Sequence, residues 1–285
     1  MTPEPAATIG QLLDEAAARL TAAGIGDARR EARRILTDVA ELAGSPVGTD
    51  RDVAAPAAIA QAMRGAVARR GTGEPLAYAT GLAGFRRLTL QVDRRVLIPR
   101  PETEGLVDLL LSRIRTGRVA DVGTGSGCVA LALADEGSFT LVAGIDRSAG
   151  ALFVARENQR RTGKRIALFQ GDLLDAVGPS SLDAVVSNPP YLTEREYREL
   201  DGSVKNWEPR EALPSGEDGL DATRRLVEDG LRVVRRGGWL ALEVDATRAE
   251  HVARLASGAG WSDVSVHMDL FDRARFVLAR RNEAE

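Results

Sequence analysis

The residues best suited to chemistry form the string Ser187-Asn188-Pro189-Pro190-Tyr191, which ends a predicted strand. Proline has a fixed φ and no backbone N–H, so the two prolines stiffen this turn and leave it rich in acceptors. The side-chain oxygen of Asn188 and the carbonyl oxygen of Pro189 can each accept one hydrogen of an –NH2 group, and Tyr191 can pack on its flat face. This arrangement favours binding a planar, weakly nucleophilic nitrogen, an amide or an aromatic amine, with its lone pair directed at an electrophile.

A glycine-rich turn, Asp121-Val122-Gly123-Thr124-Gly125-Ser126-Gly127, lies between a predicted strand and a helix predicted over residues 128–134. Glycine lets the backbone approach a ligand closely, and the start of the helix offers free N–H groups. The same pattern also matches a dinucleotide fingerprint, in which Asp146, about 20 residues downstream, would hold a ribose. The turn therefore predicts a nucleotide-like ligand.

Acidic residues mark the ends of two further predicted strands. Asp146 could accept hydrogen bonds from both hydroxyls of a ribose. Asp172 could accept from an adenine amino group while Leu173 packs on the ring. Ligands of open α/β sheets bind at the carboxyl ends of the strands, so these residues are expected to share one site. A dehydrogenase has no use for the arrangement at Asn188, and the expected ligand is therefore S-adenosylmethionine.

From residue 100 onward, helical and strand patterns alternate. Repeated strand–helix units predict an α/β fold, with a mainly parallel sheet and helices on both of its faces. The last two strands lack a clear helix between them, so they are expected to form an antiparallel hairpin at one edge. The seven predicted strands cover residues 118–122, 140–146, 165–170, 183–187, 239–244, 264–268 and 275–279.

Residues 1–75 place apolar side chains at helical spacing and predict a small helical domain. The first helix is expected to begin with a capping box of Thr8 and Gln11. Two further helices are expected, one after Asp27 and one starting at Pro56. None of these helices carries residues suited to chemistry, so substrate docking is the role expected of this domain.

Residues 76–99 change to a period of two. Residues Leu88–Val92 alternate between apolar and polar, and the apolar residues Val96–Ile98 follow. This pattern predicts a β-hairpin with its turn near Asp93-Arg94. The hairpin is expected to link the helical domain to a catalytic domain over residues 100–285.

Composition narrows the function further. The 285 residues include 38 basic and 41 acidic side chains, and a net charge of −3 gives no global attraction to nucleic acid. One cysteine and two histidines make a metal site unexpected. No apolar run approaches the ~18–20 residues of a membrane-spanning helix, and the N-terminus does not read as a secretory signal. The expected location is the cytoplasm.

The glycine-rich turn and Asn188-Pro189-Pro190-Tyr191 together resemble the amino-group methyltransferases, which include adenine-N6 DNA methyltransferases and protein glutamine methyltransferases. The upstream string Val96-Leu97-Ile98-Pro99-Arg100-Pro101-Glu102-Thr103-Glu104 is similar to that of the release factor glutamine methyltransferases. The same family is indicated by Gly73-Glu74-Pro75, Tyr78, Gly81, Phe85, Trp207–Leu213 and Gly216–Asp221. The resemblance covers nearly the whole chain.

This resemblance implies a class I, Rossmann-like methyltransferase domain behind a helical N-terminal domain. It implies S-adenosylmethionine-dependent N5-methylation of the glutamine in the Gly-Gly-Gln motif of class 1 peptide chain release factors, in translation termination. The release factor would be the partner of a monomeric enzyme that does not bind nucleic acid directly. The implied cofactor contacts are Asp121, Val122, Gly123, Thr124, Gly125, Asp146, Asp172, Leu173 and Asn188. The glutamine would be held by Asn188, Pro189, Pro190 and Tyr191, of which Asn188, Pro189 and Tyr191 are the implied catalytic residues.

The string from Pro99 to Glu104 would form the roof of the cleft, with Arg100 either paired to Glu102 or Glu104 or in contact with the ligand. Two departures from the family stand out. Leu242-Glu243-Val244-Asp245 replaces a Leu-Glu-Ile-Gly-like string, and Asp269–Arg273 lacks a common glycine. They leave open a paralogue that methylates another amide-bearing substrate.

Adenine-N6 methylation of nucleic acid is a further alternative. It would require a flipped base and usually a basic groove or a target-recognition domain, and the acidic charge balance counts against it. A cofactor-binding protein without catalytic activity is the third hypothesis.

Overall fold

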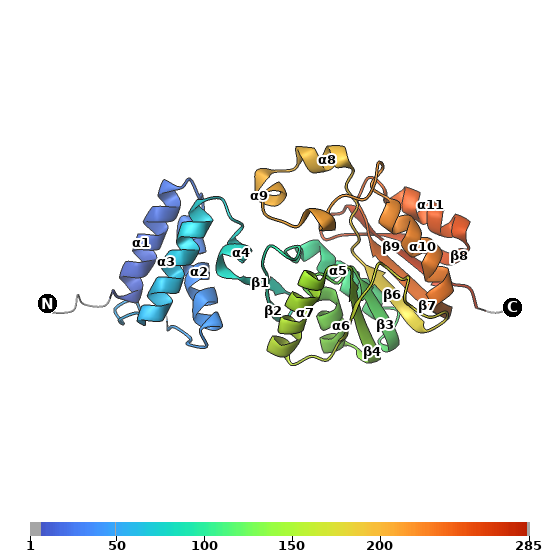
Figure 1. Ribbon diagram of the computed structural model, residues 1–285, viewed down its shortest axis with the longest axis horizontal. Coiled ribbons are helices and arrows are strands. Elements are labelled where there is room, and N and C mark those ends of the chain that lie inside the picture. The colour runs from blue at the N-terminus through green and yellow to red at the C-terminus, as the bar shows by residue number, and fades with distance from the viewer. Residues whose placement is uncertain (1–6, 49, 284–285) are drawn as a thin grey trace. The chain divides into compact units, whose positions relative to one another are not determined.

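The computed structural model describes residues 7–48 and 50–283 (Figure 1). The chain divides into two compact units. One contains the residues up to Leu82 together with Gly202–Trp207, and the other contains Ala83–Asp201 and the residues from Glu208 onward. The domain boundaries expected from the sequence, after residues 75 and 99, stay a prediction.

The first unit is helical, as the apolar spacing predicts. The hydroxyl of Thr8 accepts from the Gln11 backbone N–H at 3.2 Å, and the Gln11 side chain accepts from the Thr8 N–H at 2.8 Å, which confirms the capping box. Its core is formed by large apolar side chains such as Leu12, Ile35 and Met63. The helices are α1 (Ile9–Ala22), α2 (Ala28–Leu42), α3 (Ala57–Gly71), the short α4 (Leu76–Thr80) and the single-turn α9 (Gly202–Lys205).

A β-hairpin lies within residues 76–99 as predicted, but it pairs the predicted strand at Leu88 with the segment before it, and its turn is not at Asp93-Arg94. Strands β1 (Leu82–Phe85) and β2 (Leu88–Gln91) pair across a turn at Arg86-Arg87. The Glu104 carboxylate accepts from the Arg86 backbone N–H at 2.9 Å, and the Arg86 guanidinium bonds Glu136 at 2.7 Å. These contacts come from residues distant in the sequence, so local periodicity could not indicate this turn.

The segment after β2 forms a loop in place of the second predicted strand. The Asp93 carboxylate accepts from the backbone N–H and the guanidinium of Arg95, which makes a tight local turn. Val96 is buried, although it belongs to no strand. The prediction of a strand over Val96–Ile98 was therefore wrong.

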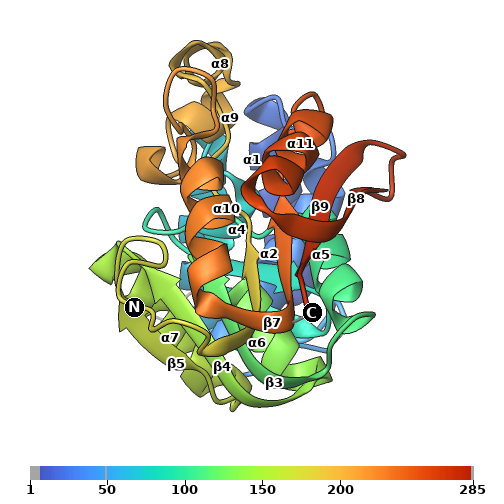
Figure 2. The ribbon, with the colours of Figure 1, turned by 90° about the vertical axis from the view of Figure 1, so that its right-hand side faces the viewer.

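The second unit contains the seven-stranded sheet, in the order β5-β4-β3-β6-β7-β9-β8. Strands β3 to β7 pair in parallel and β9 is antiparallel to β8, as predicted, and β9 is also antiparallel to β7. Strands β5 and β8 lie at opposite edges (Figure 2). The strands are β3 (Thr116–Val122), β4 (Ser138–Asp146), β5 (Ala167–Gln170), β6 (Leu182–Ser187), β7 (Val234–Glu243), β8 (Trp261–Met268) and β9 (Ala274–Arg281).

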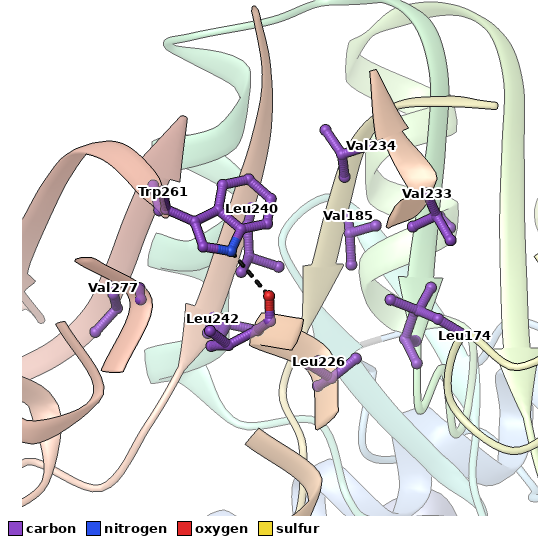
Figure 3. Close-up of a cluster of buried hydrophobic side chains, with 14 of the residues drawn as sticks. Leu174, Val185, Leu226, Val233, Val234, Leu240, Leu242, Trp261 and Val277 are labelled. Atoms are coloured by element: carbon purple, nitrogen blue, oxygen red, sulfur yellow. Dashed lines mark hydrogen bonds between the residues drawn. The ribbon is translucent and has the colours of Figure 1, made fainter. Parts of the chain in front are cut away.

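Helices cover both faces of this sheet. One buried cluster joins the sheet to α10 and α11, and the indole N–H of Trp261 donates to the Val227 carbonyl at 2.9 Å within it (Figure 3). The other cluster joins the opposite face to α5 and α6. The helices of this unit are α5 (Pro101–Leu111), α6 (Cys128–Glu136), α7 (Ala149–Thr162), α8 (Glu194–Glu199), a 3₁₀ turn (Arg210–Ala212), α10 (Asp221–Val233) and α11 (Ala249–Ala259).

The order of the strands reverses between β3 and β6. Connections from β3 proceed through β4 to β5 on one side, and β6 and β7 continue on the other side. A crevice at such a switch point, outside the carboxyl ends of the strands, is where open α/β sheets bind ligands. The glycine-rich turn follows β3 and Asn188 follows β6, so both predicted motifs lie at this point.

Candidate active site

The glycine-rich turn connects β3 to α6 in a conformation that requires glycine. Gly123, Gly125 and Gly127 all have positive φ values, of 72°, 53° and 81°. L-residues with a side chain rarely adopt this region, whereas glycine does so without penalty. The backbone N–H groups of Gly123 and Thr124 both donate to the Ile145 carbonyl, at 2.8 and 3.0 Å, which fixes the turn against β4.

Asp146, the last residue of β4, faces this turn. One carboxylate oxygen accepts from the Gly125 N–H at 2.9 Å, and the other accepts from the Ser148 N–H at 2.9 Å. A carboxylate offers about four lone-pair positions, so two backbone bonds leave capacity for the hydroxyls of a ribose. The backbone bonds also fix the orientation of the carboxylate before any ligand arrives.

Asp121 supports the turn from beneath. Its side chain is buried and accepts from the Thr124 hydroxyl at 2.6 Å and from the Ala130 N–H at 3.1 Å. Burial raises the pKa of Asp121 from its ordinary 3.8 to about 7, although both hydrogen bonds act in the opposite direction. Through its bonds to Thr124 and Ala130, the Asp121 carboxyl links the glycine-rich turn to the first turn of α6.

A cavity of about 320 Å³ opens beside these residues, within the second unit. This volume lies in the range of small-molecule sites. Six of the nine predicted cofactor residues line the cavity, and the other three, Asp121, Val122 and Thr124, are buried. The six are Gly123, Gly125, Asp146, Asp172, Leu173 and Asn188.

Asp172 has a partner that the sequence does not indicate. Arg225 of α10 donates to the Asp172 carboxylate at 2.7 Å and to Asp175 at 2.9 Å. The side chains of Asp172 and Arg225 are about half exposed, and both residues line the cavity. Arg225 lies more than 50 residues away on the chain, so no local pattern could predict the pair.

The Asn188 string forms the other side of the cavity. Asn188 and Pro190 line it, whereas Pro189 is buried and Tyr191 does not line it. The Ser187 hydroxyl donates to the Val122 carbonyl at 2.6 Å and ties β6 to β3. The side-chain amide of Asn188 donates to the Thr103 hydroxyl at 3.1 Å.

The expected roof of the cleft needs two corrections. None of the residues from Pro99 to Glu104 lines the cavity; the upper lining comes from Arg95–Leu97 and from the segment 209–216. Arg100 pairs with Glu208 at 2.6 Å, not with Glu102 or Glu104. The carboxylate of Glu208 is buried, and a buried charge is costly unless it is paired. The ion pair with Arg100 supplies that partner.

The segment 209–216 has no regular pattern in the sequence and is held by scattered contacts. The Arg147 guanidinium donates to the Glu211 carbonyl at 3.2 Å, across the cavity lining. Leu192 exchanges backbone hydrogen bonds with Leu213 and Ser215, at 3.0 and 2.8 Å. The chain just after the Asn188 string therefore fixes this second wall of the site.

Cys128, the first residue of α6, lies in surroundings that disfavour its thiolate form. Loss of hydration raises its pKa to about 12, and the nearby Asp121 carboxyl adds to this effect. Within residues 7–48 and 50–283, no cluster of three or more His, Cys, Asp or Glu side chains could bind a metal ion. No helix in the described part of the chain has the length and apolar character needed to cross a membrane.

Comparison with known proteins was made on sequence and on structure. The model of the methyltransferase small domain matches residues 102–201, and that of the PrmC N-terminal domain matches residues 11–81. The release factor glutamine methyltransferase of Geobacter sulfurreducens is 38% identical over 273 residues, covering 94% of this chain and 95% of that protein. The enzyme of the same name from Moorella thermoacetica is 39% identical over 283 residues, covering 97% and 99%.

Among solved structures, a methyltransferase from Pyrococcus furiosus matches with a TM-score of 0.54 and 19% identity. The match covers 69% of this chain and 90% of that one. At this identity the likeness concerns the fold alone, and it agrees with the mostly parallel seven-stranded sheet.

The donor set of the cavity fits S-adenosylmethionine. Asp146 keeps lone pairs that could accept from ribose hydroxyls, Leu173 lines the cavity beside Asp172, and the glycine-rich turn would allow close approach. Full-length relatives at 38–39% identity and both family models agree with this assignment. The chain belongs to the release factor glutamine methyltransferase family and is an S-adenosylmethionine-dependent methyltransferase.

Proposed function

We propose that this protein methylates the N5 nitrogen of the glutamine in the Gly-Gly-Gln motif of class 1 peptide chain release factors. The observation that carries the proposal is the position of Asn188. It lines the cavity at the end of β6, and its amide nitrogen points toward Thr103, to whose hydroxyl one of its two N–H groups donates at 3.1 Å. The side-chain oxygen is therefore the part of Asn188 available to a substrate.

A primary amide matches the acceptors of this turn. The side-chain oxygen of Asn188 and the carbonyl oxygen of Pro189 would accept the two N–H groups of the substrate amide, as the sequence predicts. Two such bonds orient the nitrogen lone pair toward the cavity. S-adenosylmethionine, held by the residues of the cavity, would supply an electrophilic methyl group to this nitrogen, with sulfur keeping the electron pair of the broken carbon–sulfur bond.

Tyr191 acts as an aromatic surface in this proposal and not as a base. Burial raises its pKa above the ordinary value of 10, so the phenol stays protonated at neutral pH. No strong base is required, because the nitrogen becomes acidic once it carries the methyl group and loses its extra proton to water. The residues of the site therefore contribute orientation and polar contacts.

The release factor is the partner in this proposal, and glycines beside the glutamine would let its backbone enter the cleft without side-chain clashes. The protein would act as a monomer in the cytoplasm, without direct contact to nucleic acid. The net charge of −3 supports the last point, since binding to a phosphate backbone depends on clustered positive charge.

The test offers several acceptors to the same enzyme with radiolabelled S-adenosylmethionine. A folded class 1 release factor should be labelled, and the same factor with asparagine in place of the motif glutamine should not. Label in adenine-containing DNA but in neither protein would overturn the proposal and favour the nucleic-acid alternative. Label that persists in the asparagine-containing factor would identify a different amide-bearing target.

A further inference from the structure

Asn188 is held by a residue from another part of the fold. Thr103 lies in the first turn of α5 and is 3% exposed. Its hydroxyl accepts from the side-chain amide of Asn188 at 3.1 Å. A side-chain amide has a donor end and an acceptor end, and this contact decides which end faces the cavity.

Glu243 lies on the other side of Thr103. It is the last residue of β7, the strand that pairs with β6 and aligns Leu242 with Ser187. Glu243 is 2% exposed, and its carboxyl group lies beside the Thr103 side chain, which acts to lower the pKa of that carboxyl. Its Oε2 atom has no hydrogen-bond partner among the residues that the structure describes.

A chain of hydrogen bonds through these three side chains would have a defined direction, with the Thr103 hydroxyl joining Asn188 to Glu243. A hydroxyl has one hydrogen to donate, and an ionised carboxylate can only accept. With Glu243 ionised, a Thr103 hydroxyl that bonds to both groups must donate to Glu243, so its lone pair is left to accept from Asn188. The acceptor oxygen of Asn188 then faces the cavity.

The opposite direction of hydrogen bonding between Thr103 and Asn188 would remove an acceptor from the substrate site. If Thr103 donated to Asn188, the amide would present its –NH2 group to the substrate. Two –NH2 groups cannot hydrogen-bond to each other as donor and acceptor, and the substrate nitrogen would lose one of its orienting contacts. A buried carboxylate behind the hydroxyl is therefore a means of fixing the orientation of Asn188.

We propose that Thr103 and Glu243 are positioning residues that hold the acceptor oxygen of Asn188 toward the substrate amide. The inference rests on the proposed function, because it takes the substrate to be a hydrogen-bond donor. Neither residue lines the cavity, so both act through Asn188.

The ionisation of Glu243 then controls the direction of the chain. Burial raises the pKa of Glu243 to about 7, while the Thr103 side chain and the charge of Arg275 lower it. A protonated Glu243 could itself donate to Thr103, and the Thr103 hydroxyl would then be free to donate to Asn188. Because that arrangement turns the –NH2 group of Asn188 toward the substrate, kcat should rise as Glu243 ionises, with increasing pH through about 7. Electrostatic interactions join Glu243 to other charged or titratable groups, namely Arg100, Glu102, Cys128, Tyr191 and Arg275.

The first test compares two substitutions of the full-length enzyme at the same position. Thr103→Val removes the hydroxyl at nearly constant shape, and kcat on a Gly-Gly-Gln substrate should fall about 10- to 100-fold, the range typical when a supporting contact is lost. Thr103→Ser restores the hydroxyl and should recover most of kcat. The dissociation constant of S-adenosylmethionine should stay within about twofold in both.

Thr223 of α10 provides the matched control. It is fully buried, and its hydroxyl has no hydrogen-bond partner among the described residues. Thr223→Val makes the same chemical change away from Asn188 and should leave kcat unchanged. A wild-type kcat in Thr103→Val, or a loss that Thr103→Ser does not recover, would overturn the positioning role.

Glu243→Gln provides a second measurement, which tests the inference even when Thr103→Val does not fold. Glutamine cannot ionise, so kcat should be low and the rise near pH 7 should disappear. A Glu243→Gln enzyme with the kcat and pH profile of the wild type would overturn the inference. A wild-type enzyme that does not methylate glutamine at all would overturn the proposed function, and this inference with it, before any variant is compared.

Discussion

In the proposed function, the chemistry depends on Asn188. Replacing it by alanine removes one pre-organised acceptor, which typically costs about 10²–10³ in rate. We expect Asn188→Ala to lower kcat by this factor while the affinity for S-adenosylmethionine changes little, since the glycine-rich turn and Asp146 make most of the proposed cofactor contacts. Single-turnover methyl transfer and calorimetric titration would measure the two effects. Asn282→Ala, at an exposed asparagine, is the control and should leave kcat unchanged. Near wild-type turnover of Asn188→Ala would contradict a role for Asn188 in the mechanism.

Asp146 should contribute to cofactor binding and not to the chemical step. A charge-assisted contact with ribose hydroxyls is worth about 1.5–3 kcal/mol, or roughly 10- to 150-fold in affinity. Asp146→Ala should raise the dissociation constant of S-adenosylmethionine by that factor, and Asp146→Asn, which keeps one acceptor, should raise it less. Asp14→Ala, at an exposed carboxylate of α1, should have no effect. An unchanged dissociation constant in Asp146→Ala would contradict the assignment.

At the scale of elements, the connection between β3 and α6 depends on the buried Asp121. Its pKa is raised from 3.8 to about 7, so the unfolded chain ionises this group at a lower pH than the folded protein does. The folded state then binds the extra proton, and its stability should decline as the pH rises from about 4 through 7. Glu243 contributes in the same direction.

Denaturant unfolding at several pH values would measure this decline. Asp121→Asn keeps an acceptor for Thr124 and cannot ionise, so the dependence of the unfolding free energy on pH should be shallower than in the wild type. A slope equal to that of the wild type would show that Asp121 ionises alike in the folded and unfolded states.

Most of the elements could be predicted from the sequence, because their apolar periods match the burial they have in the fold. Strands β3 to β9 and helices α1 to α3 follow such periods. The hairpin turn at Arg86-Arg87 could not be predicted, because Glu104 and Glu136 hold it from distant positions. The segment 209–216 could not be predicted either, because its position depends on Arg147 and Leu192.

The candidate site divides in the same way. Gly123, Asp146 and Asn188 directly follow or end strands, so strand prediction alone brings them to one edge of the sheet. Arg225 and Thr103 reach the site from helices that are distant in the sequence, and local patterns carry no signal for such contacts. The pairing of Arg100 with Glu208 spans 108 residues and was missed for the same reason.

At the scale of the whole molecule, we expect the helical unit to offer a second surface for a protein substrate. Arg29 and Arg33 are exposed and lie one turn apart on α2. A second contact, made by the helical unit, would raise the local concentration of the substrate loop. We expect the charge reversal Arg29→Glu with Arg33→Glu to raise KM for an intact release factor several-fold and to leave KM for a short Gly-Gly-Gln peptide unchanged.

Steady-state kinetics on the two substrates would separate a docking effect from damage to the catalytic unit. Equal changes on protein and peptide would contradict a docking role for this face of α2. Both arginines lie on the solvent side of a helix whose buried face contains Ala32 and Ile35, so the reversal should not disturb the core.

The central claim concerns which atom receives the methyl group. Tandem mass spectrometry of an intact class 1 release factor, after incubation with the enzyme and S-adenosylmethionine carrying a deuterated methyl group, tests it most directly. The account predicts one added methyl group on the side-chain nitrogen of the Gly-Gly-Gln glutamine, lost when the enzyme carries Asn188→Ala. A methyl group on any other residue, or an unmodified glutamine beside methylated adenine in a nucleic-acid control, would contradict it.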